Sequence, residues 1–266
     1  MPDAVHNPID RRRAAAAVSV LVILLVAAAG AIGGIVWRSW GDPPARPRAA
    51  IIDQLALTDA NPDFVASATR HLESAGYVVD YYPAEAVTVD FYRDLPRRGY
   101  SFIVLRSHTS DYRPELNQAT RGVTDVPSTG LFTNETYSTQ THLQDQRAKR
   151  LMVDRYADRE IAWQYFGITP DFIKFSTGGR FADTTIVLMG CAGLKTDDLA
   201  QAFIAKGAKE LVSWDSAVTA QHTDAATENL LEHLLDQWLE PREAIASTME
   251  EVGPDPAFGS RLLVYP

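Results

Sequence analysis

Two hydrophobic patterns divide this chain of 266 residues. Residues 14–37 read AAAAVSVLVILLVAAAGAIGGIVW, an apolar stretch without a charged residue. Beyond it, short apolar runs alternate with segments whose apolar residues recur every three or four positions. An uninterrupted apolar stretch of this length is typical of a membrane-spanning helix, whereas alternating short runs and helical periodicity predict strands and helices in turn.

The strands are predicted where apolar runs are short and end at polar or turn residues. They cover 49–53, 77–82, 101–107, 184–190, 208–214 and 261–265. The helices are predicted from the spacing of their apolar residues and from stop signals such as Gly76 and Gly207. They cover 62–75, 87–95, 143–156, 158–165, 197–206 (capped by Thr196) and 217–239. A long polar insertion at 109–183 interrupts the alternation.

Alternation of strands and helices predicts an α/β fold, a three-layer sandwich whose mainly parallel sheet is covered by helices on both faces. We expect this domain to occupy residues 49–266. Sheets of this kind bind their ligands beyond the carboxyl ends of the strands. Residues that directly follow those ends are therefore the first candidates for a functional site.

The apolar stretch at 14–37 is predicted to be an uncleaved membrane anchor. Arginines concentrated at 11–13 favour a cytoplasmic tail at 1–13 and place the domain outside the membrane, so we expect a single-pass protein of the cell membrane. The proline-rich segment 38–48 would act as a linker. A cleaved signal peptide and a buried core helix are the alternatives, but the first is usually shorter and the second is rarely apolar on every face.

Composition removes several classes of function. The net charge is −9 and the basic residues are dispersed, which argues against nucleic acid as a partner. No glycine-rich loop follows the first strand, so nucleotide binding is disfavoured, and no G-x-S-x-G sequence supports a serine hydrolase. His222, Asp224, Glu228 and His233 lack tight metal-ligand spacing, so we expect no metal site there.

The best candidates for chemistry are the sole cysteine, Cys191, and His108. Cys191 directly follows the predicted strand 184–190 and precedes a helix, a position that favours the thiolate, and His108 directly follows the predicted strand 101–107. Adjacent strand ends would bring the two together as a catalytic dyad. The alternative is that both are structural residues, because an isolated cysteine after an apolar strand is usually a small buried side chain.

These two segments, SFIVLRSHTS and TTIVLMGCAG, resemble the strands that lead into the catalytic histidine and cysteine of caspase-like cysteine peptidases, a group that includes caspases, gingipains, clostripain and separase. The resemblance covers about 49–265 and includes LAQAFIAKGAKELVSW after the cysteine. It implies a caspase-like fold, a peptide or protein substrate and no cofactor. It also implies that Cys191 is the nucleophile, that His108 protonates the leaving amine, and that the backbone N–H groups of Cys191 and Thr109 bind the oxyanion.

The resemblance also implies a substrate pocket, built from Asp53 after the first strand and from Trp214 and Asp215 after the fifth. A buried carboxylate there would select arginine or lysine before the cleaved bond. The alternative is that Asp53 begins a turn and Trp214 packs in the core. Two positions depart from the family pattern: Thr109 stands where glycine is common, and Gly190 where many members carry a small or acidic residue.

Two other functions fit the same sequence. The first is a caspase-like domain without peptidase activity that binds or senses a partner outside the membrane. The second is an unrelated α/β domain in which His108 and Cys191 never meet. The position of these two residues relative to each other separates the second alternative from the other readings.

Overall fold

The computed structural model describes residues 46–112, 128–156 and 164–266. Residues from Arg46 to Pro266 form one compact unit. The predicted tail, the predicted membrane helix at 14–37 and the linker as far as residue 45 lie outside the described residues. Within the described part of the chain, no helix is both long enough and apolar enough to cross a membrane.

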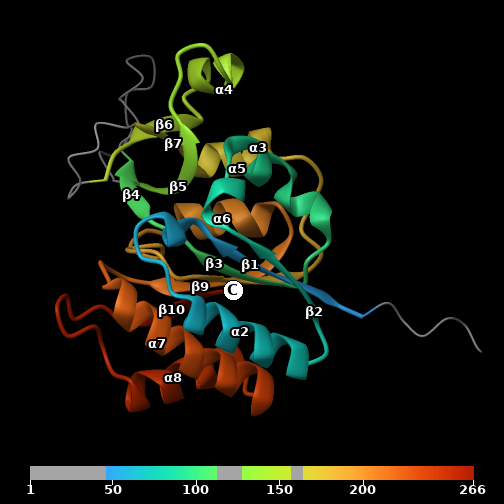
Figure 1. The fold of residues 1–266 in the computed structure, drawn as a ribbon, viewed down its shortest axis with the longest axis vertical. Helices are drawn as coiled ribbons and strands as arrows, with labels where there is room; N and C mark the ends of the chain where they lie inside the picture. The colour runs from blue at the N-terminus through green and yellow to red at the C-terminus, as the bar shows by residue number, and fades with distance from the viewer. Residues whose placement is uncertain (1–45, 113–127, 157–163) are drawn as a thin grey trace, which may run out of the picture. The chain divides into compact units, whose positions relative to one another are not determined.

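A six-stranded sheet forms the centre of this unit, with the strand order β10-β9-β8-β3-β1-β2 (Figure 1). Each pairing is parallel except that of β10 with β9. The strands are β1 (Arg48–Asp53), β2 (Val78–Tyr82), β3 (Phe102–Arg106), β8 (Thr184–Leu188), β9 (Ala208–Trp214) and β10 (Leu262–Tyr265). The prediction of an α/β fold with a mainly parallel sheet is therefore confirmed.

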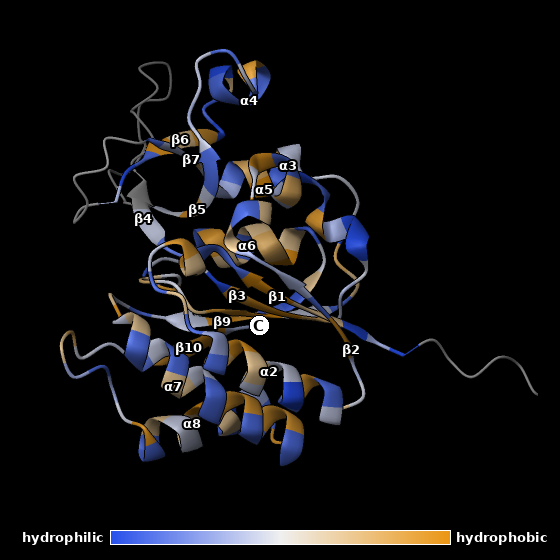
Figure 2. Cartoon of the chain, viewed as in Figure 1, coloured by the Kyte–Doolittle hydropathy of each residue, from blue (hydrophilic) through white to orange (hydrophobic). Residues whose placement is uncertain are grey.

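Helices cover both faces of this sheet (Figure 1). One face carries α2 (Pro62–Ser74), α7 (Ala220–Leu231) and α8 (Pro241–Glu251), and the other carries α3 (Val89–Asp94), α5 (Pro170–Ser176) and α6 (Asp198–Ala205). A separate hydrophobic core lies on each side of the sheet. The inner strands β1, β3 and β9 are mainly apolar, while the helices alternate apolar and polar faces (Figure 2). Each fully buried leucine or isoleucine contributes roughly 1.5–3 kcal/mol, so both cores stabilise the sheet substantially.

Side-chain caps explain where several helices begin. The Asn61 carboxamide accepts a hydrogen bond from the Phe64 N–H at the start of α2, and Pro62 takes the first helical position. The Thr219 hydroxyl accepts from the His222 N–H at the start of α7. Such caps satisfy backbone N–H groups that have no partner inside the helix. At the end of α6, Gly207 takes a φ of 98°, a conformation that favours glycine.

The predicted insertion contains a second, four-stranded sheet with the order β4-β5-β7-β6. Its strands are β4 (Thr109–Tyr112), β5 (Ser128–Thr136), β6 (Leu151–Asp154) and β7 (Tyr165–Ile168). The helix predicted at 143–156 is wrong beyond α4 (Leu143–Arg147), because Lys149 adopts a left-handed φ of 56° and turns the chain into β6. The helix predicted at 158–165 lies mostly outside the described residues, and Tyr165 belongs to β7.

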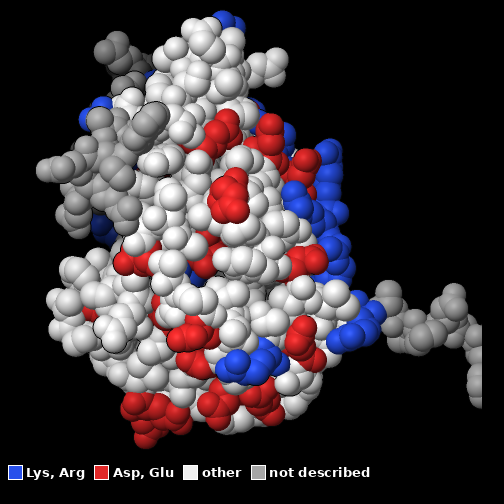
Figure 3. All heavy atoms as spheres, viewed as in Figure 1, with Lys and Arg blue, Asp and Glu red and all other residues white. Residues whose placement is uncertain are grey.

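Smaller elements differ from the prediction at their ends. The long helix predicted at 217–239 ends as α7 at Leu231 and continues as a π-helical turn, η4 (Glu232–Asp236). Asp197 rather than Thr196 occupies the cap position of α6. Three 3-10 turns, η1 (Gln54–Leu57), η2 (Ala84–Ala86) and η3 (Leu95–Arg98), complete the described elements. Acidic side chains gather over the end of the visible surface where α8 lies (Figure 3).

Candidate functional site

The two candidate catalytic residues follow neighbouring strands of the main sheet. β3 and β8 pair in parallel, with Leu105 opposite Leu188. The Met189 N–H continues this pairing by donating to the Leu105 carbonyl at 2.9 Å. His108 and Cys191 each come three residues after this matched pair. The sheet therefore delivers both residues to the same edge, at adjacent strand ends.

The segments that carry these residues are in direct contact. A Cβ atom at Gly190 would lie 2.5 Å from the Ser107 carbonyl oxygen and 2.5 Å from the Thr109 methyl carbon, so only glycine fits there without displacing the backbone. The Thr109 hydroxyl donates a hydrogen bond to the Cys191 carbonyl. The threonine that departs from the family pattern thus ties the histidine segment to the cysteine segment.

Cys191 lies in a tight turn between β8 and α6. The next residue, Ala192, has a left-handed φ of 53°, and its N–H donates to the Ser216 carbonyl at 2.8 Å. The Cys191 thiol is partly exposed. Its sulfur lies 3.4 Å from the Val218 carbonyl oxygen and 3.5 Å from the Val218 backbone nitrogen. The turn therefore holds a partly exposed thiol next to Ala192, whose left-handed backbone conformation is of the kind that occurs at functional sites.

The imidazole of His108 is held on several sides. Its Nε2 atom lies 2.9 Å from the Thr58 hydroxyl, and that hydroxyl also lies 3.1 Å from the Leu55 carbonyl oxygen. A hydroxyl that donates its one proton to a carbonyl can only accept from the ring, so this arrangement fits an imidazole that carries a proton on Nε2. The ring also packs against Phe132 and Tyr156, with centroids 5.6 and 5.2 Å away.

A buried glutamine fixes the backbone of His108. The Gln54 carboxamide oxygen accepts from the His108 N–H at 2.8 Å. Its nitrogen donates to the Asn134 carboxamide oxygen at 2.7 Å and to the Tyr156 hydroxyl at 2.8 Å. Gln54 and Thr58 both follow β1. The segment after the first strand therefore contacts His108 twice, at its backbone through Gln54 and at its ring through Thr58. Sequence reasoning missed both residues, although a glutamine directly after an apolar strand was a visible signal.

Asp53, one of the predicted pocket residues, lies in a buried ion-pair network. The Arg106 guanidinium donates a hydrogen bond of 2.9 Å to Asp53 and two hydrogen bonds, of 2.7 and 2.8 Å, to Asp224. The side chains of Arg106 and Asp53 are each only 1% exposed. Burial raises the pKa of Asp53, while the hydrogen bond from Arg106 opposes this effect. The network joins the ends of β1 and β3 to α7.

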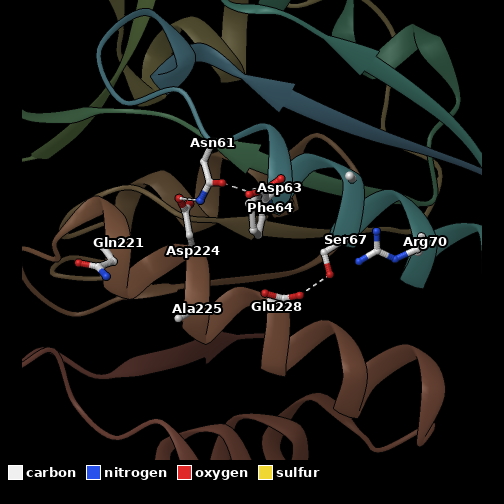
Figure 4. A pocket seen from close by; sticks show the side chains of 10 residues that line it. Asn61, Asp63, Phe64, Ser67, Arg70, Gln221, Asp224, Ala225 and Glu228 are labelled. Carbon is white, nitrogen blue, oxygen red and sulfur yellow. Dashed lines mark hydrogen bonds between the residues drawn. The ribbon is translucent and has the colours of Figure 1, made fainter.

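Asp224 also faces a groove between α2 and α7 with a volume of about 490 Å³ (Figure 4). Asn61 donates to the Asp224 carboxylate at 2.8 Å from the α2 side, and the Ser67 hydroxyl donates to Glu228 across the groove. The groove is polar, and His108 and Cys191 are not among its lining residues. It therefore belongs to the helix layer rather than to the dyad.

The other predicted pocket residues lie after β9. Trp214 is fully buried, and its indole N–H donates to the Thr223 hydroxyl, which donates in turn to the Met189 carbonyl at the end of β8. Asp215 is partly exposed, and its carboxylate accepts from the Arg261 N–H at 2.9 Å. Trp214 thus supports the strand that leads to Cys191, while Asp215 lies nearer the surface.

The structure places the predicted site residues in two groups. The segment that follows His108 contacts the Cys191 turn through the Thr109 hydroxyl, and Trp214 and Asp215 border that turn through the bond from the Leu194 N–H to the Trp214 carbonyl. Asp53 belongs to the second group, the ion-pair network of Arg106 and Asp224. Within the described ranges, no group of three or more histidine, cysteine or acidic side chains could hold a metal ion. No model of a known protein family matches the chain, and neither does any curated protein sequence.

Proposed function

We propose that residues 49–266 form a caspase-like domain that hydrolyses peptide bonds through Cys191 and His108. The observation that carries the proposal is the parallel pairing of β3 with β8, which delivers both residues to one edge of the sheet. Contacts of Thr109 and Gly190 between the two segments support it. The chemistry requires a thiol, a proton carrier and oxyanion donors, and it needs no cofactor.

In the proposed reaction the Cys191 thiolate attacks the carbonyl carbon of the scissile peptide bond. The carbonyl oxygen becomes an oxyanion, which the backbone N–H groups of Cys191 and Thr109 stabilise. Collapse of the intermediate breaks the C–N bond, and protonated His108 gives its proton to the leaving amine. Water then attacks the thioester, His108 takes one proton of that water, and the C–S bond breaks, which releases the carboxylic acid and restores the Cys191 thiolate beside protonated His108.

Two contacts support these roles. The Phe132 N–H donates to the His108 carbonyl, and Thr109 is the next residue along β4, opposite Leu131. In an antiparallel ladder this makes Thr109 and Leu131 a non-hydrogen-bonded pair, so the Thr109 N–H points away from β5 and can serve a ligand. The Thr58 hydroxyl at Nε2 fits a group that orients the imidazole.

We further propose a substrate preference for arginine or lysine before the cleaved bond. Asp53 already pairs with Arg106, so the partly exposed Asp215 beside the Cys191 turn is the better carboxylate for a basic side chain. If the stretch at 14–37 spans the membrane, cleavage takes place at its outer surface, and the substrates are peptides or proteins there.

The second candidate is an inactive caspase-like domain that binds or senses a partner. It is favoured by the contacts of the Cys191 sulfur with the Val218 backbone, which occupy the thiol with groups other than a catalytic base. In this case the dyad residues are structural, and the thiol is inert toward electrophiles.

A peptide library tests the proposal against this alternative. The full-length protein should cleave a subset of peptides, and Cys191→Ala and His108→Ala should each abolish cleavage. His71→Ala is the matched control, because His71 lies on α2 and pairs with Asp236. The proposal fails if the wild-type protein cleaves no peptide or if cleavage survives Cys191→Ala.

A further inference from the structure

An isolated carboxylate is buried in the second sheet. Asp154 of β6 is 4% exposed. One carboxylate oxygen accepts a hydrogen bond of 2.7 Å from the Ser110 hydroxyl of β4. The other oxygen, Oδ2, is buried and has no hydrogen-bond partner in the part of the chain that the structure describes. A buried carboxylate with one bond is costly when ionised, so this group needs a physical explanation.

Glycines make room for this carboxylate. A Cβ atom at Gly167 of β7 would collide with Oδ2 of Asp154, and one at Gly130 of β5 would collide with the Met152 sulfur. The absence of a side chain at these two glycines therefore leaves room over the two central strands for the side chains of Asp154 and Met152. The hydrogen bond between Ser110 and Asp154 joins β4 to β6, the strands at the two opposite edges of this sheet.

No described cation balances Asp154. Around it lie the Ser110 hydroxyl from β4, the Gly167 backbone from β7 and the Met152 thioether from β6 itself, and Tyr165 of β7 is its partner in the ladder. Tyr165 is the titratable group among them, and none of them carries a positive charge. Burial raises the pKa of Asp154 to about 6, and the Ser110 bond only partly opposes this effect.

We propose that Asp154 is a proton-binding site that controls how firmly β6 holds β4. With the proton bound, the neutral carboxyl is tolerated inside the sheet and the bond to Ser110 closes the sheet across its two central strands. After loss of the proton, the buried charge with a single hydrogen bond favours opening of β6 and entry of water. The site binds a proton whatever reaction the protein carries out.

β4, the strand that loss of the proton would loosen, directly follows His108 in the chain. β4 begins at Thr109, whose hydroxyl bonds to the Cys191 carbonyl, and Ser110 is the next residue. Mildly acidic conditions should therefore order the segment that follows His108, and neutral conditions should loosen it. This consequence for catalysis rests on the proposed function, whereas the proton-binding site itself does not.

Hydrogen exchange of the full-length protein, compared with Asp154→Asn at matched pH, tests the site. At pH 7.5, Asp154→Asn should slow exchange in β4 and β6, by up to about 100-fold because two pKa units correspond to that factor. At pH 4.5 the difference should fall to less than about 10-fold, because the carboxyl is then mostly protonated in the folded protein. Asp171→Asn, an exposed change on α5, should leave both strands unchanged at either pH.

Equal exchange at pH 7.5, or the same difference at both pH values, would overturn the proposal. A direct titration of the Asp154 carboxyl carbon by NMR in the wild-type protein guards against a variant that fails to fold. A midpoint near 6 supports the site, and a carboxylate that stays ionised down to pH 4 contradicts it and indicates a bound cation instead. Peptide cleavage is not measured in either experiment, so failure of the proposed function leaves this test intact.

Discussion

Replacing Arg106 by methionine should destabilise the domain strongly. Arg106 is buried with two carboxylates, and the substitution keeps most of its length while removing three short hydrogen bonds. Breaking a buried ion pair by removing one partner costs roughly 3–5 kcal/mol, because the remaining charge is left without compensation. Here two carboxylates, Asp53 and Asp224, lose their partner at once, so we expect the upper part of that range.

The cost of Arg106→Met should depend on pH in a defined direction. The pKa of Asp53 is already raised by burial, and loss of the guanidinium removes the interactions that oppose that rise. A group whose pKa is raised in the folded state stabilises it at low pH and loses this contribution as the pH increases. The difference between variant and wild type should therefore shrink as the pH falls from 7 toward 4.

Urea unfolding of a chain that begins at Arg46, followed by circular dichroism, measures this cost. Arg97→Met is the matched control, since Arg97 forms an exposed pair with Asp94 and should cost less than about 1 kcal/mol. Combining Arg106→Met with Asp53→Asn and Asp224→Asn should recover part of the loss. A loss below about 1 kcal/mol for Arg106→Met, or no dependence on pH, would refute the reasoning.

Three further predictions concern the dyad and its surroundings. Thr58→Val should lower peptide cleavage roughly 10-fold or more and change the His108 tautomer seen by ¹⁵N NMR, whereas Thr58→Ser should restore both; an unchanged tautomer would contradict the role of the hydroxyl. Gly190→Ala should cost roughly 1–3 kcal/mol in urea unfolding because its Cβ meets the Ser107 carbonyl, and an unchanged midpoint would refute this contact. Asp154→Asn should stabilise the protein by up to about 3 kcal/mol at pH 7 and by little at pH 4, because the raised pKa penalises the folded state increasingly as the pH rises from about 4 to about 6; a gain independent of pH would count against this explanation.

The main sheet could be predicted because each of its strands leaves a local signal. Runs such as 49–53 and 101–107 have an apolar centre, AAII and FIVL, since both faces of the sheet are covered by helices, and polar residues mark their ends. The second sheet left no comparable signal. β6 and β7 have four residues each, and their stability depends on pairing with segments distant in sequence, so the polar stretch around them was interpreted as helix.

The candidate site likewise has some residues with a local sequence signal and others whose roles depend on segments distant in sequence. His108 and Cys191 could be proposed from the sequence because each directly follows an apolar strand. The roles of Gln54 and Thr58 could not, since they depend on how the loop after β1 approaches His108, which lies 54 and 50 positions further along the chain. Asp53 was predicted as a pocket residue, and its partner Arg106 lies 53 positions further along the chain, where no local pattern connects the two.

Reactivity of Cys191 toward a peptidyl electrophile tests the central claim most directly. The full-length protein is treated with a peptidyl chloromethyl ketone that ends in arginine, and modification of its single cysteine is followed by mass spectrometry. The proposed dyad predicts rapid modification in the wild type, at least 10-fold slower modification in His108→Ala, and wild-type rates in His71→Ala. An inert thiol, or a thiol that reacts equally fast without His108, would contradict it.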